Sequence, residues 1–311
     1  MTTLSDNRAT STMSDQNRAS SAQPVTLAPA LDHRRIRMAM DRAALSDPQS
    51  AGKRFLADVG AMLVERLEFI RIEPDRILDL GDRSGTVHHL LRQRFPDAKI
   101  LSSSPTSGTA CGLARLDTPN GAALRLGADA TRLPFPDHSF SLILSNMALH
   151  WTSPLPTVLR EMRRLLTDDG LLLFTTIGDG TLAELRDVCD QVDRERSGSA
   201  RPRILTGYDL HQLGDLLQAE SFAVPVVDRE QIRPLWSSLQ ALLETLKEAG
   251  SLSTYRPTDR GLSGPGLLRR MDQLYRERHG TPEGDLPSTV EILFGHAWNN
   301  DPLPSSPLPN I

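Results

Sequence analysis

Hydrophobic positions between residues 51 and 176 fall into two alternating patterns. Short apolar runs bounded by turn residues occupy 76–80, 99–101, 124–128, 140–145 and 171–176. Helical stripes occupy 51–70, 87–95 and 155–166. Such short runs are typical of strands buried on both faces, whereas the stripes are typical of amphipathic helices. The alternation therefore predicts an α/β fold with a mostly parallel, twisted sheet and right-handed crossovers.

Beyond residue 176 the pattern changes to longer helical segments. Helix-like segments occupy 182–192, 208–221, about 235–249 and 265–279. Strand-like runs occupy 223–227 and 289–294. An insertion as long as the one between these two runs is usually functional and is often a lid. We therefore expect a helical lid insertion at about 235–280, followed by an antiparallel terminal strand.

The two ends of the chain differ in composition from the rest. Residues 1–30 are rich in Ser, Thr, Ala, Asn and Gln, and the last eleven residues carry four prolines. We expect disordered tails at 1–30 and 300–311, flanking one domain over 31–299 with a core at 74–177. Asp6 and Asp15 argue against a transit peptide, and no apolar segment suits a secretory signal or a membrane span.

Charge and cysteine content narrow the classes of function. The formal net charge is −4, and no basic stripe with interleaved aromatic residues is present, so we expect no nucleic-acid partner. Cys111 and Cys189 lie far apart and in no metal-binding spacing. This usage predicts a cytoplasmic protein without a disulfide framework or a bound metal.

The loop after the first predicted strand carries the most informative motif. In Leu78-Asp79-Leu80-Gly81-Asp82-Arg83-Ser84-Gly85, a strand ends at a glycine and turns into a helix, which places backbone N–H groups beside a ligand. The motif resembles motif I of S-adenosylmethionine-dependent methyltransferases, an acidic residue before Gly-x-Gly-x-Gly. The resemblance implies that Asp79, Gly81 and Gly85 contact the amino-acid end of S-adenosylmethionine. An ordinary strand–helix turn is the alternative.

Two positions depart from the family pattern. Arg83 replaces the middle glycine and brings a long cation that either pairs with the cofactor's carboxylate or blocks it. Ser102, in Leu101-Ser102-Ser103-Ser104-Pro105, stands where the family has the acidic residue that accepts both ribose hydroxyls. Losing a charged contact of this kind costs about 1.5–3 kcal/mol. We therefore expect weakened cofactor binding, and we expect Ser102→Asp to strengthen it.

The remaining motifs match the family more closely. Gly127-Ala128-Asp129-Ala130, followed by Leu133-Pro134-Phe135-Pro136, resembles the segment whose Asp holds the adenine amino group, which implies adenine contacts for Asp129 and Ala130. Ser145 and Asn146 match the strand end that borders the transferred methyl group. The resemblance covers 77–176 and implies the class I, Rossmann-like methyltransferase fold.

His150 and Trp151 follow the fourth strand and suggest two roles. A His beside a Trp at a strand end is more often a packed, hydrogen-bonded pair than a catalytic one. General-base duty for His150 is the alternative. No nucleophile motif accompanies them.

Two branches of the superfamily resemble the whole chain. One contains the malonyl-acyl-carrier-protein O-methyltransferases of biotin synthesis, and the other is the mitochondrial complex I assembly factor, an arginine hydroxylase. The second resembles the chain more closely at 149–151, 178–186, 209–217, 275–277 and 289–298. Three functions follow from these resemblances. They are a methyltransferase acting on a protein or acyl-carrier acceptor, an assembly factor that modifies a respiratory complex I subunit, and a catalytically degenerate binding protein.

Overall fold

A computed structural model describes residues 31–81, 83–104, 124–251 and 265–300. The tails predicted for 1–30 and 300–311 lie outside these ranges apart from Asn300, and so does Cys111. Within the described ranges, no helix is both long and apolar enough to cross a bilayer.

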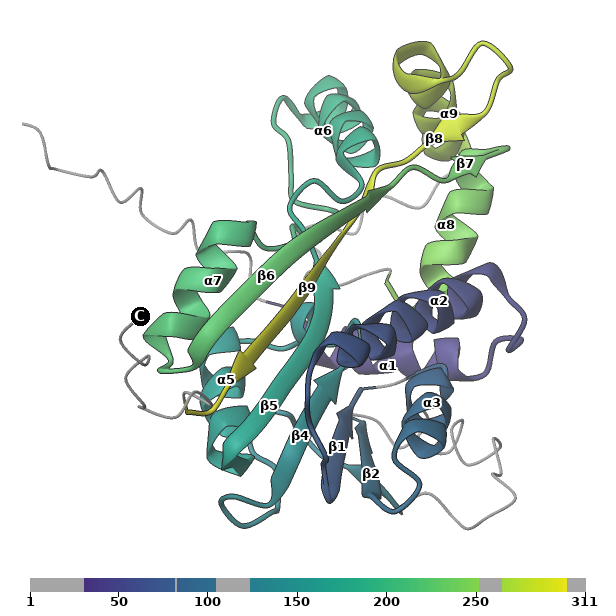
Figure 1. The fold of residues 1–311 in the computed structure, drawn as a ribbon. Helices are drawn as coiled ribbons and strands as arrows, with labels where there is room; N and C mark the ends of the chain where they lie inside the picture. Colours follow the sequence, from purple (N-terminus) through teal and green to yellow (C-terminus); the bar gives the residue numbers. More distant parts are fainter. Residues whose placement is uncertain (1–30, 82, 105–123, 252–264, 301–311) are drawn as a thin grey trace, which may run out of the picture.

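A seven-stranded sheet forms the centre of the molecule, in the order β3-β2-β1-β4-β5-β9-β6. The strands are β1 (Arg76–Leu80), β2 (Lys99–Ser104), β3 (Leu124–Gly127), β4 (Phe140–Ser145), β5 (Leu166–Ile177), β6 (Ala223–Ile232) and β9 (Val290–Trp298). Strands β1 to β5 pair in parallel, and β9 runs antiparallel between β5 and β6 (Figure 1). This topology confirms the predicted Rossmann-like fold class with its antiparallel terminal strand.

Helices cover both faces of the sheet because neighbouring residues of each strand point to opposite sides. Helices α2 (Ala51–Glu65) and α3 (Thr86–Arg94) pack on one face against alternate residues such as Ile77, Leu142 and Leu144. Helices α5 (Leu155–Leu165) and α7 (Leu210–Ala219) pack on the other face against Leu78 and Ile143. All five strand residues are fully buried, as expected for a sheet covered on both sides.

A smaller group of elements lies beyond one end of the sheet, where α6, α8 and α9 gather (Figure 1). Strand β7 (Leu235–Trp236), α8 (Leu239–Glu248), α9 (Pro265–His279) and β8 (Leu286–Pro287) form the insertion between β6 and β9. They share an apolar cluster with α6 (Ala183–Ser197) that includes Leu185, Leu242 and Tyr275. Helix α8 also packs on α2, where the Gly52 N–H donates to Glu248 Oε2 at 3.2 Å. We refer to β7, α8, α9 and β8 as the lid.

Helix α1 (His33–Ala44) is an element that the hydrophobic pattern did not lead us to expect. Asp32 caps it, accepting a hydrogen bond from the Arg35 N–H at 3.2 Å. Ile36 and Met40 are buried, and together they pack against Trp151. Most positions of the helix outside its buried stripe are charged, so the apolar stripe is narrow and is easily missed in the sequence. Its position brings the start of the described chain onto the loops that follow the sheet.

Candidate functional site

A cavity of about 490 Å³ lies beyond the carboxyl ends of the parallel strands. Open α/β sheets usually bind their ligands in this position. Its walls come from α1, the loop after β1, the loop after β3 and the turn after β4. The lining residues are His33, Ile36, Arg37, Met40, Leu80, Gly81, Arg83, Ala128, Asp129, Ala130, Thr131, Ala148, Trp151, Thr152 and Ser153. We call it the first cavity.

The loop after β1 requires both of its outer glycines. Gly81 has φ +83°, and a Cβ at this position would lie 2.5 Å from the Cβ of Ala148. Gly85 has φ +79° and is the N-cap residue of α3. Only glycine adopts such a left-handed conformation at little cost. Gly81 therefore puts bare backbone into the wall of the first cavity, which it lines directly.

Asp79 and Ser102 form a buried pair behind this loop. They are register partners on β1 and β2, and the Ser102 hydroxyl donates to Asp79 Oδ2 at 2.9 Å. His88 Nδ1 lies 3.2 Å from the same hydroxyl. Neither Asp79 nor Ser102 is among the described residues that line the first cavity. The Ser102 hydroxyl is already hydrogen-bonded within the sheet. The ribose contact predicted for Ser102 stays a prediction.

Asp129 lies on the rim of the first cavity, and Ala130 lies beside it in the wall. Asp129 Oδ1 accepts hydrogen bonds from the backbone N–H of Thr131 at 2.9 Å and from its hydroxyl at 2.8 Å. These bonds, led by the backbone one, lower the pKa of Asp129, and the nearby His33 and Arg37 act in the same direction. Asp129 Oδ2 has no donor among the described residues, so one oxygen of an ionised carboxylate remains for a ligand.

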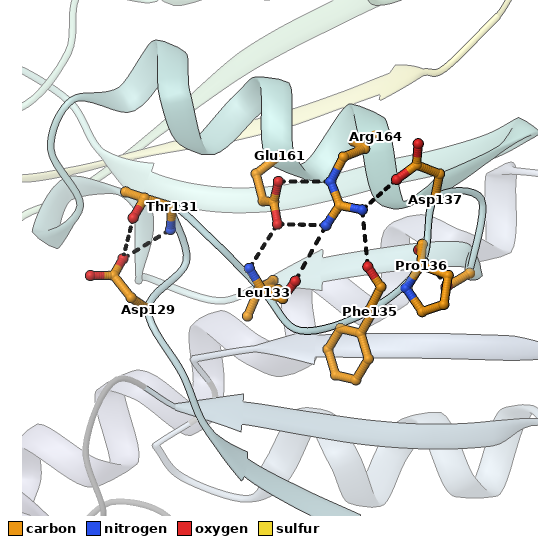
Figure 2. A network of polar contacts seen from close by, with 9 residues as sticks. Asp129, Thr131, Leu133, Phe135, Pro136, Asp137, Glu161 and Arg164 are labelled. Atoms are coloured by element: carbon orange, nitrogen blue, oxygen red, sulfur yellow. Dashed lines mark hydrogen bonds and ion pairs between the residues drawn. The ribbon is translucent and has the colours of Figure 1, made fainter.

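A network of polar contacts fixes the segment that carries Asp129 onto α5 (Figure 2). Glu161 accepts from the Leu133 N–H at 2.7 Å and from two nitrogens of Arg164 at 2.7 and 2.9 Å. Arg164 also donates to the Phe135 carbonyl at 2.9 Å. Although burial opposes ionisation, these donors lower the pKa of Glu161, and the two carboxylates around Arg164 raise its pKa. Paired charges of this kind hold the rim segment in one conformation.

Ser145 and Asn146 lie at the end of β4 but are not among the described residues that line the first cavity. Asn146 donates to the Leu56 carbonyl at 2.9 Å and accepts from the Thr175 hydroxyl at 2.9 Å, so it ties α2 to β5. The Ser145 hydroxyl is buried without a partner among the described residues. Bordering the transferred methyl group stays a prediction for both residues.

Arg83 lies in the wall of the first cavity, and its side chain joins three elements. It is 8% exposed, and its guanidinium donates to the Ala249 carbonyl after α8 at 2.6 Å and to the Met147 carbonyl after β4 at 3.1 Å. Lys53 of α2 donates to the Arg83 carbonyl at 3.0 Å. The long cation therefore does not fill the first cavity. It forms part of the wall and connects the glycine loop to the lid.

A second cavity of about 340 Å³ lies on the other side of this wall. Arg83 and Trp151 line both cavities. The other lining residues of the second cavity are Ala51, Arg54, Phe55, Leu56, Asp58, Met147, His150, Ile177, Thr181, Leu182, Arg203, Ile204, Leu205, Ile232, Pro234, Trp236, Leu242, Thr245, Leu246, Ala249, Ser251, Ser288 and Val290. These residues are mostly apolar and come from α2, the lid and the loop before α7. The cavity thus lies between the sheet and the lid.

His150 belongs to the second cavity. Its ring packs on Trp151 with centroids 4.5 Å apart, and its Nδ1 lies 3.5 Å from the Thr176 hydroxyl. Burial and, after it, the charge of Arg83 lower the pKa of His150 well below its ordinary value. The imidazole is therefore neutral at physiological pH, and it lies in a wall that also carries the charged side chains of Arg54, Arg83 and Arg203.

Three of the eight predicted cofactor residues, Gly81, Asp129 and Ala130, line the first cavity together. The main omission from the sequence-based prediction is α1; Trp151 was singled out beside His150, but its contact with α1 was not expected. The spacing of Ile36, Met40 and Ala43 behind a capping Asp32 was the available signal for the helix. No local signal places α1 on Trp151, because that contact joins segments more than a hundred residues apart. Among the described residues, no group of three or more His, Cys, Asp and Glu side chains is placed to hold a metal ion.

Comparison with known proteins gives a consistent result. Residues 78–174 match the model of a family described as "Methyltransferase domain". The malonyl-[acyl-carrier protein] O-methyltransferase of Halorhodospira halophila is 32% identical over 87% of this chain and 89% of its own length. Its namesake from Gallionella capsiferriformans is 31% identical over 88% of this chain and 92% of its own length. The closer resemblance to the complex I assembly factor, expected from the sequence, finds no support in these relatives.

Solved structures show the same fold at low sequence identity. The YcgJ protein of Bacillus subtilis is 15% identical, with a TM-score of 0.54 over 78% of this chain and 99% of its own. An N-methyltransferase of Haemonchus contortus, in complex with S-adenosylhomocysteine, is 14% identical, with a TM-score of 0.51 over 86% of this chain and 60% of its own.

Proposed function

Because this chain belongs to the class I S-adenosylmethionine-dependent methyltransferase superfamily, in the branch of the malonyl-[acyl-carrier protein] O-methyltransferases, we propose that it methylates a free carboxylate of an acyl group on an acyl carrier protein. The observation that carries this proposal is the pair of cavities that share Arg83 and Trp151. One cavity suits the methyl donor and the other the acyl end of the acceptor. The shared wall is where the methyl group would cross.

S-adenosylmethionine is the cofactor of this superfamily, and the first cavity fits it on three observations. Its volume of about 490 Å³ is in the usual range for a small-molecule site. At Gly81, where a side chain would meet Ala148, the wall is bare backbone that a ligand can approach closely. Trp151 Nε1 is a buried donor with no acceptor among the described residues, although Trp151 lines the wall. We propose that Gly81 and Gly85 shape the amino-acid end and that Asp129 and Ala130 hold adenine.

The chemistry requires little from the side chains beyond placement. The cofactor supplies an electrophilic methyl group on a sulfonium sulfur. An acceptor carboxylate is ionised at neutral pH, so no residue has to remove a proton from it. The residues of the two cavities would direct the carboxylate oxygen at the methyl group that a bound cofactor would supply, and the sulfur would keep the electron pair of the broken bond. The apolar walls of the second cavity exclude water, and the residues of the shared wall fix the direction of approach.

Because the acceptor carboxylate needs no base, His150 has a positioning role in this proposal rather than a general-base role. A neutral imidazole in the wall of the second cavity can hold an acyl group by a hydrogen bond without taking a proton from it. No specific observation favours the assembly-factor alternative, since the relatives from Halorhodospira halophila and Gallionella capsiferriformans are named for a carrier-protein acceptor. The degenerate-binding alternative remains a testable outcome.

Titration calorimetry with S-adenosylhomocysteine, followed by a methyl-transfer assay with malonyl-acyl carrier protein, tests the proposal. We expect binding, and we expect formation of the malonyl methyl ester. Binding without transfer would favour the degenerate protein. Complementation of a biotin auxotroph that lacks its malonyl-acyl-carrier-protein O-methyltransferase gives an independent readout. Failure to complement, together with a complex I defect in a deletion strain, would favour the assembly factor.

Asp129 variants test the cofactor half separately. Asp129→Asn keeps an oxygen for the Thr131 bonds but removes the charge, whereas Asp129→Ala removes both. We expect the affinity for S-adenosylhomocysteine to fall in both, by about tenfold in Asp129→Asn, because hydrogen bonds to charged groups contribute about 1.5–3 kcal/mol. Wild-type affinity in a folded Asp129→Ala protein would mean that adenine binds elsewhere.

A further inference from the structure

Arg83 occupies the boundary between the two cavities, a position to which the proposed function assigns no part in choosing the acceptor. Its side chain is nearly buried and lines both cavities. Two backbone carbonyls, of Met147 and Ala249, hold the guanidinium in place. A guanidinium is permanently protonated, so a fixed positive charge stands beside the path of the methyl group.

The charge of Arg83 is effective within the second cavity. His150 lines that cavity, and the positive charge of Arg83 lowers the pKa of its imidazole, an effect second only to that of burial. Arg54 and Arg203 also line this cavity, but Arg203 is bound on two nitrogens by the carboxylate of Asp193. Arg54 is exposed, and no described carboxylate lies within ion-pair distance of it. Asp58 is the one acidic residue among the described lining residues, and it is exposed.

A neighbouring donor adds to this polarity. Trp151 is 5% exposed, lines both cavities, and carries a buried Nε1 that lacks an acceptor among the described residues. A cation and an unused N–H donor at one boundary match a group that is negatively charged and accepts hydrogen bonds. A carboxylate has both properties. An amine acceptor would develop positive charge during transfer, close to a fixed cation, and would be disfavoured.

We propose that Arg83 is the specificity-determining residue of the second cavity and selects acceptors that present a carboxylate to the methyl donor. This inference rests on the proposed function in that the acceptor enters the second cavity. The arginine that replaces the middle glycine of the loop thus serves the acceptor side, and it leaves the first cavity open. The lid takes part because the Ala249 carbonyl holds the guanidinium.

Binding of two probes that differ in one carboxylate tests the proposal. Malonyl-coenzyme A and acetyl-coenzyme A are titrated into the protein saturated with S-adenosylhomocysteine. We expect the wild type to prefer the malonyl probe by at least about tenfold, the value of one charged contact. Arg83→Met should reduce this preference to less than about threefold, whereas Arg83→Lys should keep most of it. Arg54→Met removes the other cation of the same cavity that has no described carboxylate partner, and it should change the preference much less than Arg83→Met.

Several outcomes would overturn the inference. They are a wild-type preference near one, an unchanged preference in Arg83→Met, or an equal loss in Arg54→Met. Arg83→Gly, which restores the motif glycine, provides a second charge-free variant if Arg83→Met does not fold. The affinity for S-adenosylhomocysteine is measured for each variant, so damage to the first cavity is detected separately. If the wild type methylates malonyl-acyl carrier protein but Arg83→Met keeps the wild-type preference, the inference is refuted and the proposed function stands. If the preference depends on Arg83 but no methylation occurs, the proposed function is refuted and the binding preference assigned to Arg83 stands.

Discussion

Two buried polar residues behind the site, Ser102 and Asp79, bond to each other, and this changes how substitutions of either should be interpreted. Ser102 is 3% exposed and Asp79 is fully buried, and a 2.9 Å hydrogen bond joins them. Alignment to a motif identifies Ser102 as the counterpart of an acidic residue, but it does not reveal the partner across the sheet. The side chain's direction depends on β1 and β2 being register partners, and the sequence alone does not give that register.

Ser102→Asp is therefore expected to destabilise the fold rather than to strengthen cofactor binding. The new carboxylate would lie against Asp79 in a buried environment, where like charges repel and each resists desolvation. We expect the free energy of unfolding to fall by about 1–3 kcal/mol, a range typical of an unsatisfied buried polar group. Chemical denaturation of Ser102→Asp beside Ser102→Ala measures this. A Ser102→Asp protein as stable as Ser102→Ala, with higher affinity for S-adenosylhomocysteine, would restore the sequence-based expectation.

His150 gives the protein a specific dependence of stability on pH. Its folded-state pKa lies well below the ordinary value of about 6.5, which also describes the unfolded chain. Below about pH 6.5 the unfolded chain binds the proton and the folded one does not, so the free energy of unfolding falls as pH falls. The contribution is at most about 1.4 kcal/mol per pH unit. It is absent above that pH.

His150→Gln should remove this slope between pH 6.5 and 5, as measured by urea denaturation at several pH values. His296→Gln is a suitable control, because burial also lowers the pKa of His296 but that side chain is less enclosed. We expect a smaller change of slope in the control. An unchanged slope in His150→Gln would mean that the imidazole is accessible to protons in the folded protein.

Close packing of α2 against the end of α8 joins the sheet to the lid at the level of whole elements. A Cβ at Gly52 would lie 2.5 Å from the backbone nitrogen of Ala249 and 2.6 Å from the Thr245 carbonyl. Backbone atoms cannot move aside as a flexible side chain does. The two helices therefore need glycine at this contact, and Arg83 reinforces the same contact through the Ala249 carbonyl.

Gly52→Ala should push α8 away from α2 and lower the free energy of unfolding by about 1–3 kcal/mol, as overpacking usually does. Gly214→Ala is a matched control in α7, where a Cβ meets no atom within 4 Å. That substitution should stabilise the protein by about 0.5–1 kcal/mol, because alanine is the better helix former. Thermal denaturation of both variants tests whether Gly52→Ala destabilises the protein and Gly214→Ala stabilises it. A neutral Gly52→Ala would indicate that the lid separates from α2 without cost.

Most of the molecule's architecture could be predicted from the sequence, because each strand and helix of the sheet region is encoded by its own apolar pattern. Strand β1, predicted at 76–80, has those same bounds, and α9, predicted at 265–279, does too. The site was less predictable. Gly81 and Asp129 lie on loops at strand ends, where topology alone brings them to the cavity. The position of α1 on Trp151 and the role of Arg83 depend on contacts between distant segments, which no local pattern encodes.

The shared wall also predicts that the two ligands affect each other's binding. A cofactor analogue with a positive charge at the sulfonium position would lie on one side of Arg83 and Trp151, and the acceptor carboxylate on the other. A positive charge there attracts the carboxylate, whereas the neutral thioether of S-adenosylhomocysteine does not. We therefore expect malonyl-coenzyme A to bind about 5–100-fold more tightly with a charged, non-transferring analogue than with S-adenosylhomocysteine, a usual range for coupling between sites. Acetyl-coenzyme A should show little of this difference.

Because coupling between binding sites is reciprocal, malonyl-coenzyme A must raise the affinity for the charged analogue by the same factor relative to S-adenosylhomocysteine. Calorimetric titrations in both orders measure the two factors. Equal affinity of malonyl-coenzyme A with either analogue would contradict an acceptor carboxylate at the shared wall.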